Sequence, residues 1–286
     1  MVTPHPSIHS LLKKYGIRPK KRLGQHFLTA VPTIYKIVWA LDISSDDDVI
    51  EIGSGLGFMT NLLAHRARRV LAVERDQNLI EIARREFNFD NIAWIHSDIL
   101  KLTPRDLLGQ KGVEGQLRRA KVAGNIPYNI STPILFWMLD HRQALSRAVI
   151  MVQKEVGMRI VAPPGGKDYG IPSILIQAFA DCKRLFDLSP KSFTPPPAVT
   201  STVVQIDFRK ENPKIGNEAR FRAVVKAAFG RRRKTLRNAL LGARGLWPDA
   251  HSLDSVLAAC GIDAHRRPAT LSVDDYICLA ADLEKS

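Results

Sequence analysis

The sequence predicts an α/β protein, in which a doubly wound and mostly parallel sheet is followed by a small domain made only of helices. Two observations predict the sheet. Short apolar runs alternate with amphipathic helical stretches, and a glycine-rich turn joins the first run to the helix behind it. From about residue 211 the apolar residues recur only at helical spacing, which predicts the second domain. We therefore expect a basic N-terminal arm over 1–30, a sheet domain over 31–210 and a helical domain over 211–286.

The elements of the sheet domain follow from periodicity, in order along the chain. A first helix is indicated by Ile34, Ile37, Val38 and Leu41, with Pro32 near its start. The predicted buried strands are 49–52, 70–73, 92–95, 121–123 and 148–152. The helices between them are predicted from the inward-facing residues Leu62, Leu63 and Ala67, then Leu79, Ile82, Ala83 and Phe87, and then from the stretch 133–139.

The segment 177–208 has a different pattern. Its apolar stretches are interrupted by Ser189-Pro190 and by the proline-rich run 194–197, which predicts antiparallel strands that close the sheet. After it, two helical stripes mark the last domain: Phe221, Val224, Val225 and Ala228, and then Val256, Leu257 and Cys260.

The composition favours a folded, basic protein that binds a polyanion. The 286 residues include 42 Lys or Arg and 28 Asp or Glu, which gives a formal charge of +14 and a pI of about 9.9. The 45% of apolar residues suffices for a full core, which excludes a disordered basic tail. Neither a long apolar span nor a secretory signal is visible, so we expect nucleic acid rather than a membrane. Because Cys182, Cys260 and Cys278 contain no C-x-x-C pair, we expect reduced thiols in a cytoplasmic protein and no metal site.

The basic residues gather near the two ends of the chain. The first 41 residues contain seven Lys or Arg and no Asp or Glu, and a second run comprises 231–234 and Arg237. A basic N-terminal segment without Asp or Glu is also typical of an organellar transit peptide, which is removed from the mature protein. This segment continues into residues that look functional, so we favour the interpretation that it belongs to the working protein. We expect both clusters to contact a nucleic-acid backbone.

The strongest local motif is the stretch 51–57, a strand that enters a G-x-G-x-G turn and then a helix. Glycines allow the backbone to approach a ligand closely, and the helix start offers free N–H groups. Glu74 lies 21 residues after Gly53, at the end of the next strand, where a carboxylate can accept both hydroxyls of a ribose. Phe58 replaces the third glycine of a dinucleotide loop, and Glu51 suits a cofactor with a cationic amino-acid end. The motif therefore favours S-adenosylmethionine over NAD.

The stretch 125–128, Asn-Ile-Pro-Tyr, follows the fourth predicted strand and is the most specific feature of the chain. The exocyclic amine of adenine is a poor nucleophile, because its lone pair is conjugated into the ring. The Asn125 amide oxygen and the carbonyl of Pro127 or its neighbour can accept the two N–H groups of that amine, and Tyr128 offers a ring on which the base can stack. Asp98, after the third strand, can accept a hydrogen bond from a cofactor adenine, although an Asp there is also typical of a helix cap.

With these motifs the chain resembles the ribosomal RNA adenine N6-dimethyltransferases, and within them the bacterial type that acts on the small subunit. The likeness runs in order from about residue 10 to residue 283. Two departures, Met59-Thr60 where Leu-Thr is usual and Ser97 for a frequent Gly, remove no polar contact. The likeness is carried by six segments: 23–28, 51–57, 125–131, 153–156, 193–199 and 232–238.

The resemblance implies a Rossmann-like S-adenosylmethionine-dependent methyltransferase fold with a helical RNA-binding domain. It also implies N6,N6-dimethylation of two adjacent adenines in the 3′-terminal hairpin loop of small-subunit (16S) rRNA during ribosome biogenesis. The implied protein is a cytoplasmic monomer without metal that acts on an immature 30S particle and not on a membrane. Asn125, Pro127 and Tyr128 would hold the target base, with Phe193 as a second stacking surface. The implied cofactor contacts are His26, Leu28, Gly53, Glu74, Asp98 and Asn125.

Three alternatives stay open at this point. A large-subunit rRNA methyltransferase that confers antibiotic resistance shares the chemistry, but the proline run after Phe193 and the Arg-Arg-Lys-Thr stretch resemble the small-subunit type. A binding protein, such as an assembly or transcription factor, could keep the fold without catalysis. An NAD-linked dehydrogenase would use the same kind of sheet.

Overall fold

The computed structural model describes residues 7–109, 119–211, 213, 215–231, 234–243 and 245–281. These residues form two compact units. The first comprises the chain up to Gly157 and the segment Lys183–Phe208, and the second comprises Met158–Cys182 and the chain from Arg209 onward. The segment Met158–Cys182 was expected in the sheet domain but groups with the C-terminal helices, because α8 (Ile171–Gln177) packs against α9 (Glu218–Gly230).

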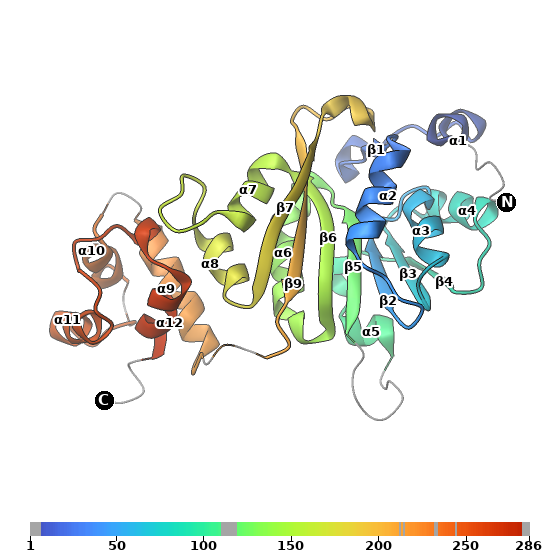
Figure 1. The fold of residues 1–286 in the computed structure, drawn as a ribbon. Helices are drawn as coiled ribbons and strands as arrows, with labels where there is room; N and C mark the ends of the chain where they lie inside the picture. The colour runs from blue at the N-terminus through green and yellow to red at the C-terminus, as the bar shows by residue number, and fades with distance from the viewer. Residues whose placement is uncertain are drawn as a thin grey trace. The chain divides into compact units, whose positions relative to one another are not determined.

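The first unit is built on a seven-stranded sheet with the order β4-β3-β2-β5-β6-β9-β7 (Figure 1). The first five strands are parallel and β9 runs antiparallel to β6, which confirms the predicted α/β fold and its closing strands. The strand order reverses between β2 and β5, and at such a point the loops after neighbouring strands diverge and leave a crevice. The strands are β2 (Asp48–Ile52), β3 (Arg69–Glu74), β4 (Ile92–His96), β5 (Ala120–Asn125), β6 (Leu145–Gln153), β7 (Ala180–Leu188) and β9 (Ser201–Phe208).

The helices of the sheet follow the predicted periodicity. In α2 (Val31–Ala40), the residues predicted to face inward, Ile34, Ile37 and Val38, are buried, and the helix packs against α3 and β6. The remaining helices of this part are α3 (Phe58–Ala64), α4 (Gln77–Glu86), α5 (Pro104–Leu108) and α6 (Ser131–Asp140), and α7 (Lys154–Val161) begins in the first unit and ends in the second.

The N-terminal segment is anchored to the sheet rather than extended from it. In α1 (Ile8–Lys14), Leu11 is fully buried in the main core, and Nζ of Lys14 lies 2.6 Å from Oε1 of Glu86. Further along, β1 (Phe27–Leu28) pairs antiparallel with β8 (Phe193–Thr194) in a separate two-stranded sheet. Segments that are far apart in the sequence therefore meet beside the main sheet.

The second unit contains α8, α9, α10 (Leu236–Leu241), α11 (Ala250–Ala259) and α12 (Val273–Ala281). Its core is aromatic: the Phe229 ring lies 6.5 Å from that of Tyr169 and 6.2 Å from that of Tyr276, measured between centroids. The predicted stripes of α9 and α11 are buried at Phe221, Val224, Val225, Ala228, Val256 and Leu257.

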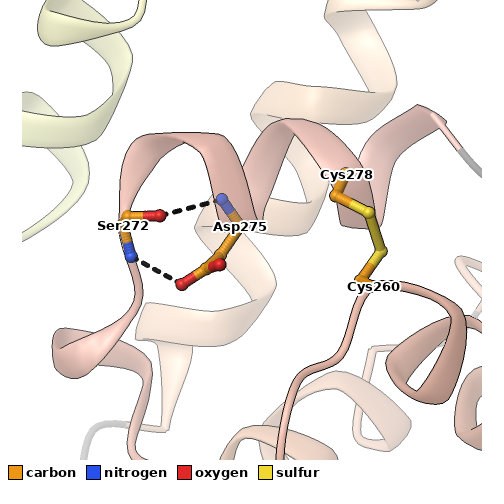
Figure 2. Close-up of a disulfide and its surroundings, with 4 residues drawn as sticks. All are labelled: Cys260, Ser272, Asp275 and Cys278. Carbon is orange, nitrogen blue, oxygen red and sulfur yellow. Dashed lines mark hydrogen bonds between the residues drawn. A yellow bond between two sulfur atoms is a disulfide. The ribbon is translucent and has the colours of Figure 1, made fainter.

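The expectation of reduced thiols is wrong for two of the three cysteines. Cys260 and Cys278 form a disulfide, with Cα atoms 5.9 Å apart (Figure 2). Cys260 caps α11 and Cys278 lies in α12, so the bond joins these helices close to the capping box in which Ser272 and Asp275 hydrogen-bond to each other's backbone N–H groups. The packing of α11 against α12 brings the two thiols together, and no short Cys motif in the sequence predicts this pairing. Cys182 is free.

Candidate functional site

A pocket lies at the carboxyl ends of β2, β3 and β5, where the strand order reverses. The loop after β2, the last residue of β3 and the loop after β5 all contribute to it. The pocket brings together nearly all of the predicted site residues: His26, Leu28, Gly53, Glu74, Asp98, Asn125, Pro127 and Tyr128.

The glycine loop has a backbone that only glycine adopts easily. Gly53, Gly55 and Gly57 have φ values of 74°, 56° and 82°. At Gly57, which directly precedes α3, a Cβ atom would lie 2.8 Å from the Trp94 ring and 3.0 Å from the Phe87 ring. Gly57 therefore has no room for a side chain, and Gly53 to Leu56 line the pocket with their backbone held by internal hydrogen bonds, such as that from the N–H of Gly53 to the Val73 carbonyl at 2.9 Å.

Glu74 holds this loop from the neighbouring strand. Its Oε2 accepts a hydrogen bond from the N–H of Gly55 at 3.0 Å, and its Oε1 accepts from the N–H groups of Arg75 and Asp76 at 2.8 and 2.9 Å. Burial raises the pKa of Glu74, while these three N–H groups oppose the rise. A carboxylate offers roughly four acceptor positions, so one remains for a ligand hydroxyl.

Glu51 is a second buried carboxyl group beside the same loop. It is 2% exposed, and its Oε2 accepts a hydrogen bond from Oγ1 of Thr60 at 2.5 Å. Burial raises the pKa of Glu51 to about 8, and the nearby charge of Glu74 adds to the rise. A cation in the pocket would favour the ionised form. The role of Thr60 was not predicted, because a threonine within a helix carries no signal of its own.

Asn125 is oriented by a segment that lies 99 residues away along the chain. Its Nδ2 donates to the backbone carbonyl of His26 at 2.8 Å, which leaves Oδ1 as the other polar end of the amide. Nδ1 of His26 lies 2.7 Å from the carbonyl oxygen of Pro195, and since a carbonyl only accepts, Nδ1 carries the proton. The His26 ring also stacks with Tyr128, at 5.6 Å between centroids and 22° between planes.

Tyr128 is half-buried, and its hydroxyl group lies 2.5 Å from Oγ of Ser201, the first residue of β9. Burial raises the pKa of Tyr128. The carbonyl of Pro127 accepts from the N–H of Ile130 at 3.1 Å, and Oγ of Ser131 lies 3.3 Å from both this carbonyl and that of Tyr128, so the Pro127 carbonyl is engaged within the turn. The contact with Ser201 was not predicted, because a lone serine at a strand start has no distinguishing pattern.

Asp98 has the capping role that the sequence left open and also lies at the pocket, where the bond to an adenine stays a prediction. Its Oδ1 accepts from the N–H of Leu100 at 3.1 Å and so caps a short 3₁₀ helix, while the residue also lines the pocket. Its Oδ2 lies 3.5 Å from Nη1 of Arg75.

Phe193 does not support the expected second stacking surface. Its side chain is 3% exposed, belongs to the main hydrophobic core and is not among the pocket residues. Pairing of β8 with β1 places Phe193 opposite Leu28 and turns its ring away from solvent. The ring therefore offers no free face to a base.

The basic clusters are only partly available as free cations. Nζ of Lys20 lies 2.8 Å from Oδ2 of Asp76, and the guanidinium of Arg237 donates to both oxygens of Asp254 at 2.5 and 2.8 Å. Arg232 and Arg233, which belong to the second predicted cluster, lie outside the described residues. Over the described ranges, no helix is long and apolar enough to cross a membrane.

Comparisons with known proteins agree with this geometry. The family model for ribosomal RNA adenine dimethylase matches residues 16–273. A "Ribosomal RNA small subunit methyltransferase A" of Geobacter metallireducens is 45% identical over 268 residues, which cover 93% of this chain and 95% of the relative. A protein of the same name from Syntrophus aciditrophicus is 41% identical and covers 98% of this chain and 99% of its own. A dimethyladenosine transferase from Plasmodium falciparum has a similar structure, with a TM-score of 0.77 and 25% identity over 91% of this chain and 98% of that one.

Proposed function

Because the chain belongs to the ribosomal RNA adenine dimethylase family, we propose that it transfers methyl groups from S-adenosylmethionine to N6 of adenines in small-subunit rRNA. One observation carries this proposal. The loop over 53–57 and Glu74 line the same pocket as Asn125 and Tyr128, so a nucleoside cofactor and a target base can be held next to each other. Relatives named for the small subunit, at 41–45% identity, favour that subunit over the large one.

The pocket suits S-adenosylmethionine in both shape and charge. Glu51 and Glu74 are buried carboxyl groups in a pocket that is otherwise largely apolar, and both would be stabilised by a cation beside them. Glu74 would accept from the ribose hydroxyls, Asp98 would accept from the adenine, and Glu51 would pair with the cationic amino-acid end. When bound, S-adenosylmethionine supplies an activated methyl group on its sulfonium.

The protein's own residues then present the target amine. Oδ1 of Asn125 accepts one N6 hydrogen, because the hydrogen bond from Nδ2 to the His26 carbonyl fixes the orientation of the amide and leaves Oδ1 for the base. The second acceptor is the backbone carbonyl of Ile126, the neighbour of Pro127, since the Pro127 carbonyl is engaged by Ile130 and Ser131. Tyr128 offers its ring to the base. Two acceptors on the N–H groups draw the lone pair out of conjugation and stabilise the positive charge that develops on nitrogen.

No strong general base is required by this arrangement. The proton on N6 becomes acidic only as the carbon–nitrogen bond forms, and once the nitrogen carries the positive charge the proton leaves to solvent water. Most of the acceleration comes from alignment, which in favourable intramolecular reactions is worth about 7–11 kcal/mol.

The finer assignment extends the family's chemistry to a particular substrate. The proposed targets are two adjacent adenines in the 3′-terminal hairpin loop, where the bases need little unstacking before they enter a pocket. The proposed substrate particle is an immature 30S subunit, and the enzyme acts as a cytoplasmic monomer. The high positive charge supports an RNA partner and disfavours a role in which the protein meets only a small molecule.

The test is to incubate the protein with tritiated S-adenosylmethionine and purified small subunits that lack these methyl groups. We expect tritium in the small-subunit rRNA, recovered as N6,N6-dimethyladenosine after nuclease digestion. Fully methylated subunits serve as the control and should take up no label. Label in large-subunit rRNA, or in neither subunit, would contradict the proposal.

A further inference from the structure

The outer face of α2 carries an exposed aromatic stripe that the catalytic site does not use. Val31, Tyr35 and Trp39 are 44%, 45% and 65% exposed and follow one another at intervals of four residues, which places them on one side of the helix. Three of the five large hydrophobic residues that the described part of the chain exposes are therefore on this one helix. The opposite face of α2 packs against α3 and β6 of the same unit (Figure 1). The helix therefore makes its core contacts without Val31, Tyr35 and Trp39.

Cations lie on and beside this stripe. The guanidinium carbon of Arg66 is 4.5 Å from the centroid of the Trp39 ring, and Nζ of Lys36 is 5.6 Å from the ring centroid of Phe186. Stacking of Arg66 covers one face of the indole, and the large exposure of Trp39 leaves the rest of the ring to solvent. An open aromatic ring with a neighbouring guanidinium is the combination on which nucleobases stack in proteins that bind single-stranded nucleic acid.

The charge balance around α2 also favours a polyanion. Within the described residues, neither Lys36 nor Arg66 has a carboxylate within 4 Å. Three of the four acidic residues in the segment after α2 lie within 4 Å of other cations. These pairs are Asp42 with Arg147, Asp47 with Lys121, and Asp48 with Arg68.

We propose that the stripe formed by Val31, Tyr35 and Trp39, with Lys36 and Arg66, is a second contact surface for the rRNA, on which an unpaired base stacks against Trp39. The positive charge of Arg66 and Lys36 then neutralises the phosphates that flank this base. This inference rests on the proposed function, because it assigns an RNA partner to the same unit that carries the methyl-transfer pocket. Unlike the catalytic site, this surface contributes to the affinity for RNA and not to the rate of methyl transfer.

The experiment measures the dissociation constant of the whole protein for a protein-free transcript of the small-subunit rRNA and for small subunits. Trp39→Ala and Trp39→Leu should weaken binding to the transcript by about 5- to 100-fold, since neither residue stacks on a base. Trp39→Phe should bind within a few-fold of the unchanged protein. Arg66→Ala should also weaken binding, whereas Arg85→Ala, which removes another exposed arginine from α4, should not. Thermal unfolding verifies that each variant is folded.

A single-turnover rate at saturating RNA separates this surface from the catalytic site. The rate should be the same for Trp39→Ala as for the unchanged protein. Three results would overturn the inference: unchanged transcript affinity for Trp39→Ala, full affinity for Trp39→Leu, or a loss seen only on small subunits, which would mean that α2 docks on a ribosomal protein. If the unchanged protein transfers no methyl group while Trp39→Ala still weakens RNA binding, the proposed function fails and the contact surface stands.

Discussion

Replacing Asn125 by Ala should abolish most methyl transfer while leaving the fold and RNA binding nearly intact. The variant loses Oδ1, the acceptor aimed at the target amine, and also the Nδ2 bond of 2.8 Å to the His26 carbonyl. Removal of one hydrogen-bonding group that acts on developing charge costs about 10²- to 10³-fold in rate, or about 3–4 kcal/mol. The lost bond to His26 is partly buried and neutral, so stability should fall by only about 1 kcal/mol.

The assay is a single-turnover transfer of tritiated methyl groups at saturating RNA and cofactor, with the RNA dissociation constant measured in parallel. Asn125→Asp keeps an acceptor but loses the donor to His26, so its rate should lie between those of the unchanged protein and Asn125→Ala. Asn78→Ala, which shortens an exposed asparagine on α4, is the matched control and should be fully active. A normal rate for Asn125→Ala would refute the assignment of this amide to the reacting nitrogen.

Three further changes test other parts of the structure. Glu74→Gln should weaken S-adenosylmethionine binding by about 10- to 100-fold, because hydrogen bonds to a charged acceptor are replaced by weaker ones. Calorimetric titration would measure the affinity, and an unchanged value would count against the contact between Glu74 and the ribose. Burial raises the pKa of Glu51 from 4.5 to about 8, so between these pH values the folded chain keeps a proton that the unfolded chain releases. Glu51 therefore destabilises the fold increasingly as the pH rises from about 4.5 to about 8. In the absence of cofactor, Glu51→Gln should therefore raise the Tm near pH 9 and change it little near pH 4, and an equal effect at both would contradict this. The joint replacement of Cys260 and Cys278 by Ser should lower the free energy of unfolding of the helical unit by about 3 kcal/mol, because the bond closes a loop with a sequence separation of 18. A denaturant titration would measure this loss. In the same titration, the control Cys182→Ser should have little effect.

The inner part of the sheet was predictable because strands such as β2, β3 and β6 are largely buried apolar runs with clear ends, whereas β4 and β7 are only partly buried. The predicted runs at 49–52, 70–73 and 148–152 lie within β2, β3 and β6. The grouping of Met158–Cys182 with the C-terminal helices was not predictable in this way, because helical periodicity marks an apolar face but does not say which neighbour covers it. The same reason explains the disulfide, since Cys260 and Cys278 meet only through the packing of α11 and α12.

Within the site, residues at the ends of strands were predictable, and residues that support them were not. Glu74 and Asn125 could be placed in the pocket from strand order alone, because parallel strands end at one edge of the sheet. Thr60 and Ser201 hold Glu51 and Tyr128 by single hydrogen bonds, and a hydroxyl residue at either place fits many other roles equally well. Phe193 was assigned to the pocket by family resemblance alone, and the pairing of β8 with β1 buries it instead.

His26 shows why three distant segments of the chain act as one element. Its carbonyl accepts from Asn125, its ring stacks with Tyr128, and its Nδ1 donates to the carbonyl of Pro195. The stretch 23–28 therefore supports the loop after β5 on one side and the proline run on the other, so the direction of the Asn125 amide depends on all three. A change of ring at His26 would disturb the base-binding residues even if it left the other expected cofactor contacts in place. Three of the segments that carry the family resemblance, 23–28, 125–131 and 193–199, are thus coupled physically through the contacts of His26.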